Sequence, residues 1–115
     1  MKKLIIALAA TSIGAAALAG TTAETHLQSG MHRYVIERTF PAGALAGLNA
    51  EAKAKVNANN KVAGVRWIQS YANADKTKTY CVYEGPSEAA IREASRLNNL
   101  PVDNVMEVPV TLNPN

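Results

Sequence analysis

The spacing of apolar residues in this 115-residue chain switches repeatedly between the period of a β-strand and that of a helix. Tyr34, Ile36 and Phe40 alternate with their neighbours, which predicts a strand over residues 32–40. Leucine, alanine and valine then recur every three or four positions, which predicts a helix over residues 45–58 that a pair of asparagines closes. One strand and one helix therefore open the fold.

Two further alternating stretches, residues 62–71 and 77–84, flank a short segment of turn-forming residues. In the first stretch, Trp67, Gln69 and Tyr71 share one phase of the alternation. Turn residues between two strand patterns are typical of a β-hairpin. We therefore predict two antiparallel strands here.

A Gly-Pro pair ends the hairpin, and a second helix follows. The hydroxyl of Ser87 is placed to accept a hydrogen bond from a first-turn amide, so Ser87 is the predicted N-cap. The apolar stripe of this helix comprises Ala90, Ile91, Ala94 and Leu97. Asn98 and Asn99 can supply a left-handed residue at its end, and Pro101 prevents its continuation. Residues 102–110 form the last predicted strand.

The order β-α-β-β-α-β predicts an α+β fold of the ferredoxin-like type, with a four-stranded antiparallel sheet and two helices on one face. The large rings of Trp67, Tyr71, Tyr80 and Tyr83 are too many for the helix side alone, so some should occupy the bare face. A second subunit would cover them there, and we expect a homodimer. Strand register decides which face each ring occupies, because a shift of one residue reverses every side chain.

The first 19 residues have the pattern of a cleavable secretory signal. Lys2 and Lys3 precede an uncharged stretch that is rich in alanine and short for a membrane-spanning helix. Cleavage is predicted after Ala19, with Ala23 as the alternative site, and a retained N-terminal anchor is the competing interpretation. The expected product is periplasmic or secreted.

Processing would leave a small and nearly neutral protein. Two of the 12 Lys and Arg residues lie in the signal and none of the 9 acidic residues does, so the net charge falls to +1. No block of basic residues remains, and we expect neither nucleic-acid binding nor membrane binding after signal cleavage. The expected parts are a flexible leader over residues 20–30, a domain over residues 31–110 and a C-terminal tail over residues 111–115.

Cys81 is the only cysteine, so no internal disulfide can form. It lies in an apolar and aromatic run, where a thiol usually behaves as a small hydrophobic side chain. We expect it to be buried. A reactive or metal-binding thiolate is the alternative.

Four blocks of sequence resemble a family of small bacterial domains that was long labelled only as of unknown function. The blocks are YVIERTFP at 34–41, GVRWIQSY at 64–71, YCVYEGPS at 80–87 and AIREA at 90–94. One branch of that family is described as nickel-binding, with a ferredoxin-like fold assembled as a dimer. The resemblance spans about residues 33–108 and implies the same fold, dimerisation, and nickel or another divalent metal as a bound ion.

The candidate metal ligands are His32, Glu37, Gln69 and Glu84. Many members of the family have histidine where this chain has Gln69, and an amide is a poorer ligand than imidazole for such a metal. His32, at the start of the first strand, would supply an imidazole instead; a solvated role is its alternative. An ion pair with the neighbouring Arg38 is the alternative role of Glu37.

No phosphate-binding loop, Cys/His metal spacing or nucleophile motif occurs in the sequence. Candidate pocket residues are Trp67, Tyr71 and Tyr83. Two further function classes therefore stay open beside metal binding. One is an interaction or inhibitor module that uses the C-terminal tail. The other is a small-molecule enzyme with Glu37, Gln69 and Tyr71 as the polar groups of an interior pocket.

Overall fold

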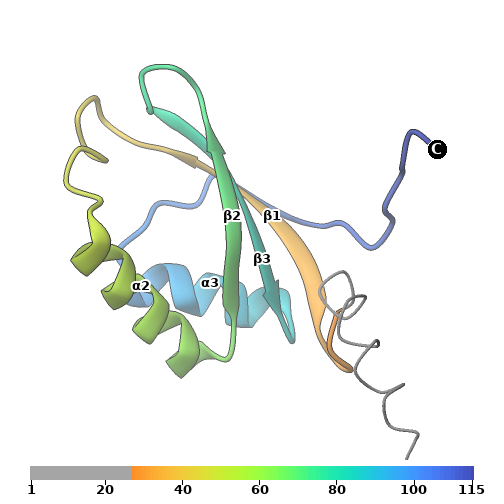
Figure 1. The fold of residues 1–115 in the computed structure, drawn as a ribbon. Coiled ribbons are helices and arrows are strands. Elements are labelled where there is room, and N and C mark those ends of the chain that lie inside the picture. The colour runs from red at the N-terminus through yellow and green to blue at the C-terminus, as the bar shows by residue number, and fades with distance from the viewer. Residues whose placement is uncertain (1–26) are drawn as a thin grey trace, which may run out of the picture.

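The computed structural model describes residues 27–115. The predicted signal, both cleavage sites and the first part of the leader lie outside the described residues. The elements are β1 (His32–Thr39), α2 (Ala50–Ala63), β2 (Arg66–Ala72), β3 (Lys78–Gly85), α3 (Glu88–Leu97) and β4 (Asn104–Glu107). This order is the predicted β-α-β-β-α-β arrangement (Figure 1).

The four strands form one antiparallel sheet in the order β2-β3-β1-β4. Both helices lie on the same side of this sheet, as Figure 1 shows. The predicted ferredoxin-like fold is confirmed, and the sheet has a helix face and an open face. After β4 the chain runs away from the domain toward its C-terminus (Figure 1), and Val110 and Leu112 are largely exposed.

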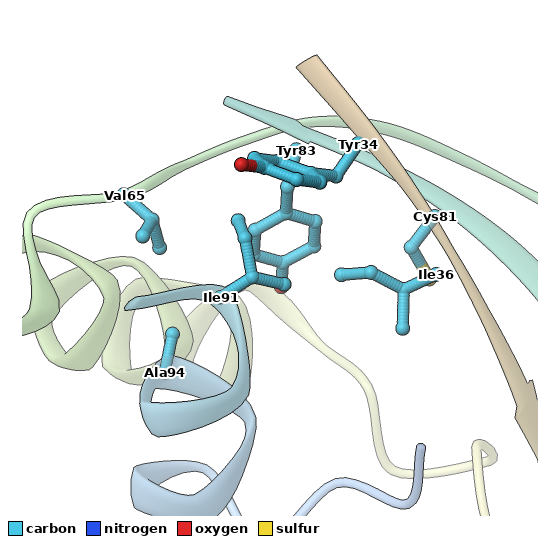
Figure 2. Packing of buried hydrophobic residues seen from close by; sticks show 7 residues of the cluster. All are labelled: Tyr34, Ile36, Val65, Cys81, Tyr83, Ile91 and Ala94. Atoms are coloured by element: carbon cyan, nitrogen blue, oxygen red, sulfur yellow. The ribbon is translucent and has the colours of Figure 1, made fainter. Parts of the chain in front are cut away.

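The core lies between α3 and the central strands β1 and β3. Ile91 and Ala94 of α3 point toward Tyr34, Ile36 and Tyr83 of the sheet (Figure 2), and all five are buried. Complete burial of a side chain such as Ile36 or Ile91 contributes about 1.5–3 kcal/mol. The alternation of β1 and the apolar stripe of α3 therefore meet as the sequence predicts.

The ends of α3 follow the sequence prediction. The hydroxyl of Ser87 accepts a hydrogen bond from the amide of Ala90 at 3.1 Å and caps the helix. Asn99 adopts the left-handed conformation with a φ of 56°. Pro101 follows two residues later, where it prevents further helical turns.

The first helix begins and ends five residues later than predicted, because α2 spans Ala50–Ala63. Asn49 is its N-cap and accepts a hydrogen bond from the amide of Ala52. Gly64, with a φ of 78°, provides the left-handed residue that ends the helix. Asn60 does not close the helix; it is buried inside its last turns. The leucines that suggested an earlier start lie in the turns that precede α2.

Strand β2 carries a β-bulge between Trp67 and Gln69 that the alternation did not reveal. Trp67 pairs with Tyr83 of the helix face, whereas Gln69 pairs with Val82 of the open face. The extra residue at Ile68 therefore reverses the phase, and residues of one sequence phase lie on opposite faces.

The last strand is shorter than the predicted residues 102–110, because only Asn104–Glu107 pair with β1. Prolines flank this segment at positions 101 and 109, and proline has no amide hydrogen to donate to a neighbouring strand. In the described part of the chain, neither helix combines the length and the apolar run needed to cross a membrane.

Candidate functional site

A cavity of about 370 Å³ lies between the helix face of the sheet, α2 and the turns before α2. Its walls are mostly apolar or aromatic side chains: Phe40, Leu45, Leu48, Val56, Trp67, Ala72, Tyr83 and Leu100. Its polar lining consists of Arg38, Lys53, Ser70, Lys76 and Thr79, together with the thiol of Cys81. Among the residues that the structure describes, the cavity lining therefore includes three cationic side chains and no carboxylate.

Arg38 is the most unusual residue of the cavity lining, since it is only 1% exposed. Its Nη1 donates to the carbonyl of Pro101 at 2.8 Å and to the hydroxyl of Ser95 at 3.1 Å. Its Nε and Nη2 are buried and have no hydrogen-bond partner in the described residues. Its Cζ lies 5.7 Å from the ring centre of Tyr83, a cation–π distance.

Sequence reasoning missed Arg38, although a signal existed. The residue shares the alternation phase of Tyr34, Ile36 and Phe40, all of which are buried. An arginine in the apolar phase of a strand indicates a buried charge.

His32 and Glu107 adjoin at the edge of the sheet formed by β1 and β4. Nδ1 of the imidazole lies 2.9 Å from Oε2 of the carboxylate. Both side chains are nearly half exposed. Burial raises the pKa of the neighbouring Tyr34 hydroxyl, and the carboxylates of Glu107 and Glu88 raise it further. Glu107 is a second site residue that the sequence did not indicate.

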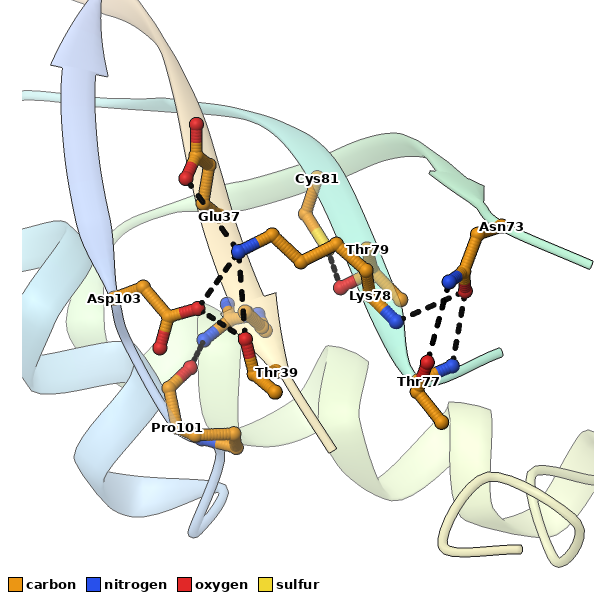
Figure 3. A network of polar contacts seen from close by, with 10 residues as sticks. Glu37, Thr39, Asn73, Thr77, Lys78, Thr79, Cys81, Pro101 and Asp103 are labelled. Carbon is orange, nitrogen blue, oxygen red and sulfur yellow. Dashed lines mark hydrogen bonds and ion pairs between the residues drawn. The ribbon is translucent and has the colours of Figure 1, made fainter. Parts of the chain in front are cut away.

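Glu37 belongs to a surface cluster that we call the Lys78 network: Glu37, Thr39, Lys78 and Asp103. The Lys78 ammonium lies 3.7 Å from the Glu37 carboxylate and 3.1 Å from that of Asp103 (Figure 3). Hydrogen bonds from Thr39 and Lys78 hold the pKa of Asp103 below its usual range. The expected ion pair of Glu37 therefore forms with Lys78, because Arg38 points to the opposite face of β1.

Glu84 is buried and paired with two arginines. Its carboxylate lies 3.2 Å from Nη2 of Arg33 and 3.0 Å from Nη2 of Arg66. These contacts offset the cost of burying the carboxylate. A metal at Glu84 would have to displace both arginines.

Gln69 and Tyr71 lie together on the open face, where the Gln69 amide donates to the Tyr71 hydroxyl. Strand β3 separates them from Glu37, since Tyr71 pairs with Tyr80 and Tyr80 pairs with Glu37. Trp67 and Tyr83 line the cavity on the other face. The structure thus divides the candidate pocket residues between two faces.

Cys81 is buried and contacts the hydroxyl of Thr79 at 3.5 Å, as Figure 3 shows. It packs with Ile36 in the core cluster. The expectation of a buried thiol is confirmed.

The described part of one chain supplies two adjacent candidate metal ligands and not three. Among residues 27–115, no three His, Cys, Asp or Glu side chains lie close enough together to hold a metal ion. His32 and Glu107 supply an imidazole and a carboxylate in contact. His26, the other histidine, lies outside the described residues.

The described domain is similar to a known protein family and to a solved structure. The model of the nickel responsive protein family SCO4226-like matches residues 34–108. The crystal structure of SCO4226 from Streptomyces coelicolor A3(2) is similar with a TM-score of 0.59 and 22% sequence identity, covering 70% of this chain and 99% of that chain. A comparison with curated proteins gives no match.

The sheet order and the two helices on one face define a small α+β domain of the ferredoxin-like class. Within that class, the chain belongs to the SCO4226-like family of nickel responsive proteins.

Proposed function

We propose that this protein binds a divalent metal ion such as nickel and acts outside the cytoplasm as a homodimer. The description of its family supports a metal-related role. The observation that carries the proposal for this chain is the contact between His32 and Glu107.

The His32–Glu107 contact has the chemistry of a metal-binding histidine with its supporting carboxylate. When Nδ1 carries the ring proton, it donates to Glu107 and leaves the lone pair of Nε2 free for a metal. Imidazole is a suitable ligand for nickel. The side chains are 47% and 44% exposed, so an ion can reach them from solvent. Water or a second chain would supply the remaining ligands.

The open face of the sheet supports the proposed dimer. The middle of the open face is apolar and aromatic. Val35 lies between Val82 and Met106 of the two neighbouring strands, and Tyr80 lies beside Tyr71. Met106 and Tyr71 are more than half exposed. An apolar centre with a charged margin is the usual composition of a protein interface.

The two ends of the open face carry opposite net charge. Arg33 and Arg66 around Glu84 give one end a net charge of +1, whereas the Lys78 network gives the other end a net charge of −1. A two-fold axis that runs across the strands would place each end against the opposite end of the partner. Such an isologous pairing is complementary in charge.

The sequence of residues 1–19 supports export, since it combines two lysines with an uncharged, alanine-rich run. N-terminal sequencing of the protein from the periplasm or culture medium tests this part. A first residue at position 20 or 24 agrees with export. An intact N-terminus found only in the cytoplasm contradicts it.

Calorimetric titration of the isolated protein with nickel tests the metal site. His32→Asn should abolish the binding, and Glu107→Gln should weaken it by roughly 10–100-fold because the carboxylate orients the ring. Glu51→Gln, an exposed first-turn substitution in α2, is the matched control. Parallel titrations with zinc and copper measure selectivity.

Glu37, Gln69 and Glu84 provide the alternative ligand set in the same experiment. Nickel binding that survives His32→Asn but is lost in Glu37→Gln would move the site to the open face. The absence of any nickel binding would reject the metal proposal.

Sedimentation equilibrium tests the dimer. Tyr80→Arg places a charge at the centre of the open face and should produce a monomer. Val62→Arg is the control, because Val62 is 79% exposed on α2, on the other side of the sheet. A wild-type monomer, or a dimer that Val62→Arg disrupts and Tyr80→Arg does not, contradicts this interface.

A further inference from the structure

We propose that the cavity between the sheet and α2 binds a small carboxylate with an apolar body. This inference is independent of metal binding, since the cavity lies on the helix face and its lining includes neither His32 nor Glu107.

The positive charge of Arg38 lies in the lining of this cavity. The guanidinium is almost completely buried, and none of the ion pairs in residues 27–115 includes it. A buried charge without a counterion is strongly unfavourable. The ring of Tyr83 compensates part of this cost through the cation–π contact. A bound anion would supply the missing negative charge.

Two donor nitrogens of Arg38 are free to bind a ligand within the described part of the chain. Nη1 of Arg38 is occupied by Ser95 and Pro101. Nε and Nη2, which have no hydrogen-bond partner among residues 27–115, together form one edge of the planar guanidinium. That edge can hold a carboxylate through two parallel hydrogen bonds.

The walls of the cavity combine positive charge with apolar side chains. Lys53 and Lys76 are exposed and add positive charge to the lining, while Phe40, Leu48 and Trp67 are apolar or aromatic. One buried cation inside a largely apolar cavity suits a single negative charge joined to a hydrocarbon body. The volume of about 370 Å³ lies at the small end of ligand pockets. The ligand class is therefore a small monocarboxylic acid.

Trp67 makes this proposal directly measurable, because it is the only tryptophan of the chain and it lines the cavity. Its indole Nε1 donates to the Ser70 hydroxyl, another residue of the lining. A ligand in the cavity should change the tryptophan fluorescence. Cyclohexanecarboxylate is the probe, and cyclohexanecarboxamide is its neutral counterpart.

The carboxylate should give a saturable change in Trp67 fluorescence, and the carboxamide should bind at least about tenfold more weakly. In the NMR spectrum of the protein, the carboxylate should also shift the Nε–H resonance of Arg38. Equal affinity for the two compounds, or no change at concentrations up to about 10 mM, overturns the proposal. Binding of inorganic phosphate in place of the carboxylate overturns the ligand class.

Arg38→Gln should abolish the preference for the carboxylate, but this substitution of a buried residue can also impair folding. Two exposed positions of the lining keep the test decisive. Lys53→Gln should weaken carboxylate binding by about two- to fivefold at low salt, and Ala72→Leu should block the cavity. Lys61→Gln on α2, outside the lining, is the control. Carboxylate affinity that is unchanged in Ala72→Leu overturns the location.

Discussion

The side-chain amide of Asn98 donates a hydrogen bond to Oδ1 of Asn60 at 3.0 Å, which joins the end of α3 to the buried side of α2. Asn98 also accepts from Nδ2 of Asn59 at 2.9 Å. One asparagine beyond α3 therefore holds two neighbouring residues of α2. This contact fixes the helix that covers the cavity.

Asn98→Ala should lower the free energy of unfolding by about 1–3 kcal/mol, because it leaves the buried Asn60 carbonyl without its donor. Urea denaturation measures the loss. Asn57→Ala, at an exposed position of α2, is the control and should change stability by less than about 0.5 kcal/mol. An equal effect of both substitutions would contradict the role of Asn98.

Gly85→Ala should destabilise the domain by overpacking. A β-carbon at this position would lie 2.8 Å from Cγ1 of Val65 and 3.1 Å from Cδ1 of Ile91. The expected loss is about 1–3 kcal/mol in thermal or urea unfolding. Val65→Ala removes the closest atom. Gly85→Ala should therefore cost less stability in a Val65→Ala background than in the wild-type protein. Full additivity of the two substitutions would argue against this contact.

Asp103→Asn should make the free energy of unfolding less dependent on pH in the acid range. The pKa of Asp103 is lowered below its ordinary value of 3.8 by the hydrogen bonds from Thr39 and Lys78. A lowered pKa in the folded state gives stability that is present above the ordinary value and is lost as pH falls through the folded pKa. Unfolding measured from pH 5 downward should therefore be less pH-dependent in the variant; an unchanged slope would contradict the prediction.

Tyr34→Phe should make the free energy of unfolding less dependent on pH in the alkaline range. Burial and two nearby carboxylates raise the pKa of the Tyr34 hydroxyl above its ordinary value of 10.0. The stability linked to this group is complete below that value and is lost as pH rises through the folded pKa. Chemical denaturation at increasing pH measures the difference. Tyr71→Phe on the exposed face is the comparison, and equal effects would contradict a special role for Tyr34.

Much of the fold could be predicted from local patterns. The alternation of Tyr34 and Ile36 predicted β1, and the hydroxyl of Ser87 predicted the start of α3, because both signals depend on residues close in sequence. The position of α2 could not be predicted in the same way. Its strongest apolar candidates, Leu45 and Leu48, precede the helix and line the cavity instead.

The candidate sites were predicted less well, because they depend on contacts between distant residues. His32 was a candidate ligand, but its partner Glu107 is 75 residues away in sequence. Tyr71 was expected to share a pocket with Trp67, but the bulge places the two side chains on opposite faces of the sheet. The phase of Arg38 in β1 indicates burial, but only the structure shows that its guanidinium has no ion-pair partner in residues 27–115.

The bulge at Ile68 means that β2 contains one residue more than the partner strand requires. A homologous chain that lacks this residue would keep regular alternation, with Trp67 and Ser70 on the helix face and Gln69 between them on the open face. An alignment gap belongs at this position for such a homologue. Deletion of Ile68 would thus leave every other side chain of β2 on its present face of the sheet. A strand of the same length without the bulge would instead turn each side chain after Trp67 to the opposite face.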